Sequence, residues 1–409
     1  MKITVFNIVS VTVLLFASIL DFSCSRSSSV SSVKRDELFS MEYGAFENQL
    51  NLFNLSSTGT IDTRLAMRNG FFYISNGEAQ KILQLNSYGD LLTLYHNPES
   101  NPIPIFDGAE DESGNTSAKG AVVSTRKTVE YPFDTPSLIA IDSRQNIFCV
   151  ETLPRERQEQ DNGMTLRQVI LRFYSDSFAG YIGQQGLGGT PFPFIKNIYT
   201  KDDDSLVVVC VVPDGMQVYT FNPEGHLVSS VLVKSSDIPN PYKEKVDANI
   251  YIQLENVVPD ISSKSLFVKA DYYETSVDNA SKIQSGIDYA GTYVFPLDVV
   301  TGKYEDGIAV PPYEDTFAEG FSKQVFNLPY DFLGVTSSGW LFFSIAVDNG
   351  YMIEMVHSSG SKILKRKLIF DNTKVVYHNF SLSDSGIISA LLALKDKVQI
   401  VWWRTDSIL

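Results

Sequence analysis

Residues 69–92 read NGFFYISNGEAQKILQLNSYGDLL and contain the pattern on which the rest of the chain is built. Two short runs, Phe71–Ser75 and Ile82–Leu85, are rich in aromatic and aliphatic residues and are separated by a polar turn. Gly89 follows the second run, and Leu91 opens a third. Short runs of this kind, bounded by Gly and Asn, are typical of β-strands joined by tight turns. The stretch therefore predicts three consecutive strands.

The same order of strand, turn, strand, Gly turn and strand returns along the chain. The further copies lie in residues 139–182, 206–228, 266–304, 333–368 and 380–403. A spacing of roughly 40–60 residues with several short strands in each copy is typical of β-propeller blades. A β-sandwich would have strands without a repeated internal order, and the strand content excludes a solenoid of helix pairs. The sequence therefore predicts an all-β chain folded as a β-propeller.

The junction after the second copy carries a resemblance to a known repeat. Residues 181–192 read YIGQQGLGGTPF and follow the strand-like run Ile170–Tyr174. This segment resembles the Gly-rich junction, ending in Pro and Phe, that joins one blade to the next in NHL repeats. The likeness covers most of residues 47–409, and two or three blades match it well. It implies an NHL-like propeller.

The two ends of the chain indicate the number of blades. The last copy ends at Trp402-Trp403 after three strands, with no residues left for a fourth. Near the other end, Gln49–Leu55 has the pattern of a strand without a hairpin of its own. We expect this N-terminal strand to complete the last blade and close a ring of six. Five or seven blades would result if the insertions hide or mimic a strand.

The N-terminus has the features of an export signal. Lys2 is followed by an apolar stretch from Ile3 to Leu20 and then by Cys24, and Ser dominates residues 25–32. The segment resembles a bacterial lipoprotein signal peptide, although Asp21 and Phe22 depart from the usual residues before the cysteine. The resemblance implies a signal peptide (1–23), a lipidated Cys24 with a flexible tether (24–46) and a propeller body (47–409). An ordinary secretory signal and an uncleaved membrane anchor are the alternatives.

The net charge limits the kinds of partner that the protein can bind, and the cysteine content indicates whether disulfides stabilise its fold. The formal net charge is −15, so the acidic body repels nucleic acid and anionic lipid, and we expect neither to be a natural partner. Cys149 and Cys210, the cysteines of the body, both lie in apolar strand-like runs. We expect them to be buried free thiols, so that a hydrophobic core and not a disulfide stabilises the fold.

No motif in the sequence identifies a catalytic residue. There is no Gly-x-Ser-x-Gly, no calcium loop and no pair of histidines at ligand spacing. Asn76 and Glu151 end equivalent strands of neighbouring copies and are the candidates for a metal site, with calcium as the ion. Trp402 and Trp403 are candidates for binding a partner, because successive strand residues face opposite sides. The polar insertions, where binding residues often lie, are residues 97–127, 154–165, 236–247, 276–285 and 311–317.

Two functions from different classes follow from these features. The first is a non-catalytic binding or scaffold module of the bacterial cell envelope, anchored by lipid, which presents its faces and loops to a protein or glycan; the sequence does not say on which membrane face. The second is a propeller enzyme, either a lactonase-like hydrolase that uses a central metal or a dehydrogenase with a quinone cofactor. The enzyme would require carboxylates and amides to converge on the central channel, with Asn76, Asp142 and Glu151 as the nearest candidates.

Overall fold

The structure is a computed structural model that describes residues 30–53, 61–105, 126–161, 163–244, 249–277, 284–319 and 322–409. The predicted signal peptide (1–23) and Cys24 lie outside the described residues. In the part of the chain that is described, no helix has the length and apolar character needed to cross a membrane.

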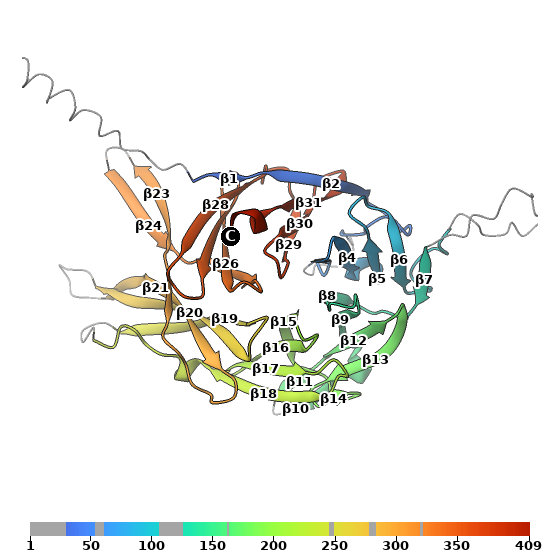
Figure 1. Ribbon diagram of the computed structural model, residues 1–409, viewed down its shortest axis with the longest axis horizontal. Coiled ribbons are helices and arrows are strands. Elements are labelled where there is room, and N and C mark those ends of the chain that lie inside the picture. The colour runs from blue at the N-terminus through green and yellow to red at the C-terminus, as the bar shows by residue number, and fades with distance from the viewer. Residues whose placement is uncertain are drawn as a thin grey trace, which may run out of the picture.

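Six β-sheets are arranged in a ring around a central axis, so the predicted six-bladed β-propeller is confirmed (Figure 1). We number the blades in chain order by their innermost strands. Blades 1 to 6 begin with β3 (Arg64–Arg68), β8 (Pro136–Ile141), β15 (Phe194–Thr200), β19 (Ile250–Pro259), β25 (Asp331–Val335) and β29 (Tyr377–Leu382).

The remaining strands of each blade follow outward from the axis in antiparallel order. The second strands are β4 (Phe71–Asn76), β9 (Ile147–Thr152), β16 (Leu206–Val212), β20 (Ser265–Val277), β26 (Trp340–Val347) and β30 (Ile388–Ala393). The third strands are β5 (Lys81–Leu85), β12 (Gln168–Tyr174), β17 (Gly215–Phe221), β21 (Gln284–Asp298), β27 (Gly350–His357) and β31 (Lys397–Trp403). The fourth strands are β6 (Leu91–His96), β13 (Ser177–Gly183), β18 (Leu227–Lys234), β22 (Ile308–Val310), β28 (Ile363–Ile369) and β2 (Arg35–Glu42).

Short elements extend or connect the blades. Three further strands lengthen the outer edges of blades 1, 2 and 5, and two separate hairpins are inserted between strands. The added edge strands are β7 (Lys127–Glu130), β14 (Gly186–Leu187) and β1 (Ser32–Val33), and the hairpins are β10 (Glu159–Asp161) with β11 (Met164–Leu166) and β23 (Tyr313–Glu319) with β24 (Ser322–Leu328). The 3-10 turns are η1 (Gly77–Ala79), η2 (Arg155–Arg157), η3 (Ser235–Asp237) and η4 (Thr405–Ile408).

The core consists of apolar clusters at the interfaces between neighbouring blades. The second strand of a blade is covered on both faces, so its buried residues form continuous runs such as Val207–Cys210. Cys149 and Cys210 are both buried free thiols, as predicted. Apolar burial between blades, without a disulfide in the described residues, therefore stabilises the ring.

The Gly-rich junction between blades 2 and 3 owes its composition to a close backbone approach. A Cβ atom at Gly183 would lie 2.2 Å from the carbonyl oxygen of Gly189. At the end of the junction Phe192 is fully buried, and its N–H donates to the Gln168 carbonyl oxygen at 2.6 Å. Only glycine allows the first contact, so the composition of this segment follows from the geometry of the blade junction.

The ring is closed by an N-terminal strand, as predicted, but by a different segment. β2 pairs with β31 and supplies the outermost strand of blade 6. Of the expected strand Gln49–Leu55, the described residues 49–53 contribute only an isolated bridge, between Leu50 and Tyr43. In addition, β1 pairs in parallel with β28 of blade 5. Residues 32–42 therefore join the outer edges of blades 5 and 6 (Figure 1), and the propeller begins within the stretch predicted to be tether.

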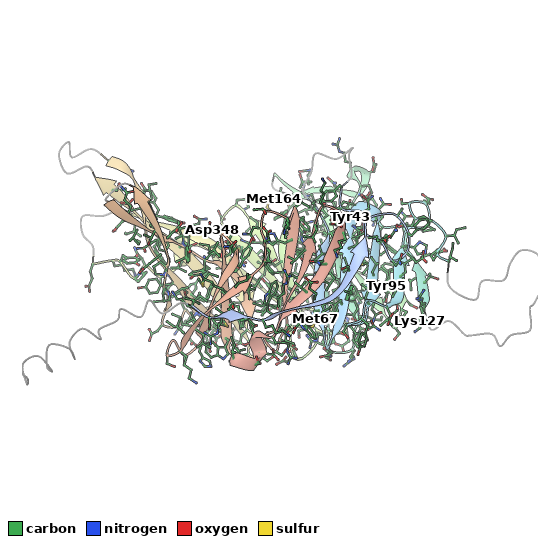
Figure 2. All side chains as sticks on the ribbon, turned by 90° about the horizontal axis from the view of Figure 1, so that it is seen from above. Tyr43, Met67, Tyr95, Lys127, Met164 and Asp348 are labelled. Atoms are coloured by element: carbon green, nitrogen blue, oxygen red, sulfur yellow. The ribbon has the colours of Figure 1, made fainter. Side chains whose placement is uncertain are left out.

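The described parts of two predicted polar insertions belong to strands of hairpins. Of residues 276–285, Ser276 and Val277 end β20 and residues 284–285 begin β21, while the residues between them lie outside the described part of the chain; residues 313–317 belong to β23. Seen from above, both hairpins rise on the side of blade 4 above the face that carries Asp348, while Met67 lies toward the other face (Figure 2). Both faces of such a hairpin are exposed to solvent. Its strands therefore lack a continuous apolar face, and their sequence resembles that of a loop.

Candidate functional site

The axis of the ring contains a small cavity whose lining is a mixture of polar and apolar groups. Its volume is about 310 Å³, and residues of all six inner strands line it, including Leu65, Leu138, Ile198 and Val258. Among the described residues that line the cavity, one has a carboxylate side chain, Asp384. Within the described part of the chain, no group of three or more His, Cys, Asp or Glu side chains is placed to hold a metal ion. A calcium ion, which prefers six or more oxygen ligands, does not fit this lining.

Asn76 is buried at the end of β4 and is used within its own blade. Its Oδ1 accepts the Asn51 N–H at 3.0 Å, and its Nδ2 donates to the Asn51 carbonyl oxygen at 2.7 Å and to Thr63 Oγ1 at 2.8 Å. Its exposed fraction is 0%, and it does not line the axial cavity. Asn76 therefore fixes the segment around Asn51 against blade 1.

Glu151 occupies the equivalent position in β9 and also lies outside the axial cavity. Its Oε1 accepts the backbone N–H groups of Asp134 and Thr135 at 2.6 and 2.8 Å, whereas its buried Oε2 has no hydrogen-bond partner among the described residues. Burial raises the pKa of Glu151 to about 7, against the lowering effect of the two N–H donors. The structure thus places both metal candidates at matching positions without bringing them together around an ion.

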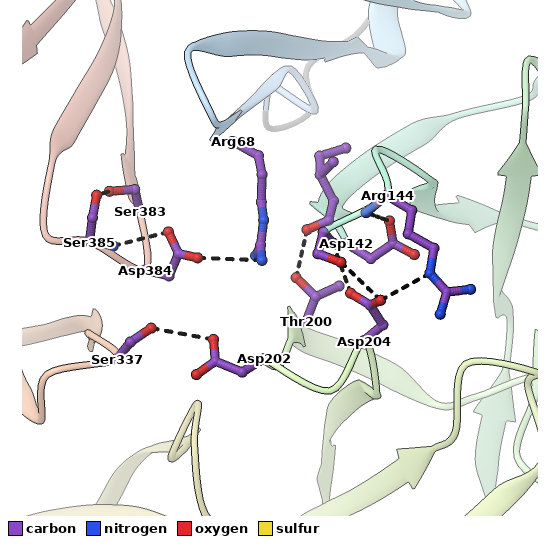
Figure 3. Close-up of polar contacts among 12 residues, drawn as sticks. Arg68, Asp142, Arg144, Thr200, Asp202, Asp204, Ser337, Ser383, Asp384 and Ser385 are labelled. Carbon is purple, nitrogen blue, oxygen red and sulfur yellow. Dashed lines mark hydrogen bonds and ion pairs between the residues drawn. The ribbon is translucent and has the colours of Figure 1, made fainter.

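One mouth of the axial cavity is a ring of polar turns between first and second strands (Figure 3). Asp204, in the turn between β15 and β16, accepts two hydrogen bonds from Ser143 of blade 2. The backbone N–H donates at 2.8 Å and the Oγ hydroxyl at 3.0 Å. Asp202, in the same turn, accepts from Ser262 of blade 4 at 3.0 Å and from Ser337 of blade 5 at 3.3 Å. The Asp-rich turn Asp202–Asp204 therefore connects four blades.

Asp142, the third candidate for the enzyme alternative, lies in this ring (Figure 3). Its Oδ1 accepts the N–H groups of Arg144 and Asn146 at 2.9 and 2.8 Å, within its own turn. Next to it along the ring, Arg68 of blade 1 pairs with Asp384 of blade 6 at 3.4 Å. These carboxylates thus accept hydrogen bonds within their own turns or interact with side chains of other blades.

Comparison with known proteins shows similarity to other propellers. No family model matches the chain, and no curated protein matches it. A solved gluconolactonase from Xanthomonas campestris is 12% identical, with 91% of this chain and 96% of that chain covered at a TM-score of 0.39. The hydrazine synthase of Kuenenia stuttgartiensis is 8% identical, with 83% and 80% covered at a TM-score of 0.39. An ulvan lyase of polysaccharide lyase family PL25 is 12% identical, with 90% and 95% covered at a TM-score of 0.38. At these identities and scores the likeness says nothing about activity.

A much larger cleft lies away from the axis, where blades 5 and 6 meet the β23–β24 hairpin. Its volume is about 1140 Å³. Its lining mixes charged, amide and aromatic side chains, among them Arg35, Tyr313, Asp348, Lys374 and Gln399. A concave site of this size and mixed polarity is where a ligand or a segment of a partner usually binds.

Asn372 is one of the amide side chains that line this cleft. Its Nδ2 donates to the carbonyl oxygen of Val347 at 2.7 Å, which fixes the orientation of the side chain. Its Oδ1 is buried and has no hydrogen-bond partner among the described residues. An unpaired buried acceptor costs free energy, about 1–3 kcal/mol.

The two tryptophan candidates lie at the blade interfaces. Trp403 is fully buried in the cluster between blades 5 and 6, and Trp402 is half-buried and contacts Phe72 of blade 1, with their ring centroids 6.4 Å apart. Arg404 lies over the outer part of the Trp402 ring, 5.8 Å from its centroid. Both tryptophans therefore contribute to the ring closure.

Sequence reasoning found only part of the cleft, because Tyr313 and Asp315 lie in the predicted polar insertion 311–317. The other lining residues come from the N-terminal strand, the β26–β27 turn and the connection between blades 5 and 6, which are far apart in the chain. The polar connection between two predicted blades, residues 371–374, was a further signal.

Proposed function

We propose that this protein is a non-catalytic binding or scaffold module of the bacterial cell envelope, held at a membrane by lipid on Cys24. In this proposal a protein or glycan partner binds in the cleft between blades 5 and 6. The observation that carries the proposal is the cleft itself, with its size and its mixed charged, amide and aromatic lining. The NHL-like character of the blades is part of the same proposal.

The enzyme alternative is less well supported by the geometry. Asn76, Asp142 and Glu151 each accept hydrogen bonds from nearby backbone N–H groups and do not line the axial cavity. The carboxylate that does line the cavity among the described residues, Asp384, pairs with Arg68. A propeller enzyme of the kind considered would need polar groups that converge on the axis and are free to bind a metal or a substrate. No observation favours the enzyme as a second proposal.

Lipidation can be tested directly. We expect the protein recovered from bacterial membranes to begin at Cys24 and to carry acyl chains, as measured by mass spectrometry of the N-terminal peptide. Cys24→Ala should abolish acylation and release the protein from the membrane fraction. A mature chain that keeps residues 1–23, or that begins elsewhere without lipid, would sink this half of the proposal.

Binding in the cleft can be tested by site-specific photo-crosslinking in intact cells. A crosslinking amino acid at Asp348, on the cleft wall, should yield a defined adduct, and the same group at Ser177, exposed on blade 2, should not. Asn372→Ala should weaken the Asp348 adduct. Binding of the purified protein to a glycan array tests whether the partner is a carbohydrate. No adduct specific to Asp348 and no glycan bound in an Asn372-dependent way would contradict the proposal.

A further inference from the structure

The chain joins the propeller at a defined point on the edge of blade 5. Val30 packs against the apolar cluster shared by blades 4 and 5. The carbonyl oxygen of Ser31 accepts the Lys367 N–H at 3.1 Å, and Ser32 and Val33 then pair in parallel with Lys367 and Leu368 of β28. From Val30 onward, the chain is therefore part of the folded body.

This attachment limits how far the body can lie from a membrane anchor. Six residue steps separate Cys24 from Val30. A fully extended chain covers at most about 3.6 Å per residue, so these steps span no more than about 22 Å. Lipid on Cys24 would thus hold the edge of blade 5 close to the headgroups. Blade 2, on the opposite side of the ring, would be held farthest away.

The strand at this edge is unusually basic for so acidic a protein. Four of the six residues from Lys362 to Lys367 are Lys or Arg, in a chain with 33 basic and 48 acidic residues. Lys365 pairs with Glu354 at 2.9 Å, but no carboxylate of the described residues pairs with Lys362, Arg366 or Lys367. β28 thus carries unpaired positive charge at the point where the chain enters the body.

Apolar side chains flank these charges. Ile363 and Ile369, at the two ends of β28, are 44% and 50% exposed. Basic residues together with exposed aliphatic side chains suit the boundary between lipid headgroups and acyl chains.

The overall charge of −15 does not prevent such a contact. At physiological ionic strength, interactions between exposed charges are screened over about 8 Å. A membrane beside blade 5 is therefore affected mainly by the charges at this edge, while the residues of the more distant blades contribute little. These charges include Asp315, Asp348 and Asp371, which line the cleft together with Lys367. An anionic surface would attract the unpaired basic residues Lys362, Arg366 and Lys367.

We propose that the propeller lies edge-on to its membrane, with β28 of blade 5 against anionic lipid headgroups. This inference rests on the proposed lipidation of Cys24. In this orientation the short connection at residues 24–30 and the charges of β28 act together, and the blades opposite blade 5 face away from the lipid.

Fluorescence quenching in proteoliposomes tests the orientation with the full-length processed protein. Because Cys149 and Cys210 are buried, a cysteine introduced at the surface is the site that a thiol-reactive fluorophore labels. Ser361→Cys places a fluorophore beside Lys362, and Ser177→Cys, also exposed, places it on blade 2. In phosphatidylcholine vesicles with phosphatidylglycerol and a nitroxide-labelled headgroup lipid, we expect severalfold stronger quenching at Ser361→Cys. Equal quenching at the two sites would overturn the proposal.

Charge reversal tests the headgroup contact. Lys362→Glu with Lys367→Glu should reduce quenching at Ser361→Cys in vesicles with phosphatidylglycerol but not in pure phosphatidylcholine. Arg155→Glu with Arg157→Glu, an equal charge change at exposed positions of blade 2, should have no effect. Unchanged quenching after the β28 reversal would overturn the contact. Flotation of the vesicles separates the two proposals, because protein that fails to float lacks the anchor, whereas protein that floats without site-specific quenching is anchored but not oriented.

Discussion

Asp204 of blade 3 accepts two hydrogen bonds from Ser143 of blade 2, from its N–H at 2.8 Å and from its Oγ at 3.0 Å. Arg144 Nε lies 3.4 Å from the same carboxylate. Asp204 is buried, whereas Asp203 beside it is exposed. One carboxylate thus connects the turns of neighbouring blades where the ring has its polar mouth, which explains why only part of the Asp-rich turn is solvated.

Replacement of this carboxylate should destabilise the ring. Asp204→Ala leaves the Ser143 N–H without its acceptor, and we expect the free energy of unfolding to fall by about 1–3 kcal/mol. Urea denaturation followed by tryptophan fluorescence measures the change. Asp203→Ala is the matched control in the same turn and should have a smaller effect, because the Asp203 carboxylate accepts only the Ser205 N–H, at 3.1 Å. Equal losses in the two variants would refute the special role of Asp204.

Glu151 should make the stability depend on pH. Its pKa is raised from 4.5 to about 7, mainly by burial, so the folded protein binds more protons than the unfolded chain between these pH values. The Glu151 contribution is therefore most favourable below about pH 4.5 and is lost as the pH rises to about 7, by about 3 kcal/mol in total. Glu151→Gln keeps an acceptor for the N–H groups of Asp134 and Thr135 and does not titrate.

The comparison of the two proteins isolates this effect. We expect the free energy of unfolding of the wild type, relative to Glu151→Gln, to fall steadily between about pH 4.5 and pH 7 and to stay constant above it. Denaturation in urea at a series of pH values gives the difference curve. A flat curve would show that Glu151 is not perturbed by its burial.

The thiols of the body should be inert in the folded state. Cys149 and Cys210 are fully buried, and burial raises the pKa of both thiols. Because the thiolate is the reactive form, we expect a Cys24→Ala variant to show no reaction with a thiol reagent in its native state and reaction of both thiols in guanidinium chloride. Rapid reaction of either thiol without denaturant would contradict the burial that the structure shows.

The repeat, the blade number and the second strands could be predicted from the sequence because they depend on local patterns. A run such as Val207–Cys210 is apolar throughout because neighbouring blades cover both of its faces. The closing strand could not be found in this way. β2 lies at the outer edge, only Met41 of its eight residues is buried, and its first three residues are all charged, so it has no apolar run that would predict a strand.

The candidate site was predicted less well, for a related reason. Asn76 and Glu151 were correctly paired as equivalent positions, yet equivalence along a repeat does not bring two side chains together. The cleft requires Arg35, Asp348 and Lys374 to meet, and only ring closure by β2 and the inserted β23–β24 hairpin brings these distant segments together. No local pattern records that arrangement.

The stability of the closed ring should depend on β2 and not on the residues before Val30. A variant that starts at Val30 keeps β1 and β2, whereas a variant that starts at Tyr43 loses the pairing of β2 with β31 and the burial of Met41 and Phe39 against blade 1. Loss of a single buried Met side chain costs about 2–5 kcal/mol, so we expect the shorter variant to lose at least this much. It should also expose the edge of β31, which favours aggregation. Urea denaturation and light scattering of the two variants measure both effects. Equal stability of the two variants would mean that the ring closes without its N-terminal strand, and the pairing of Arg35–Glu42 with Lys397–Trp403 would then be dispensable.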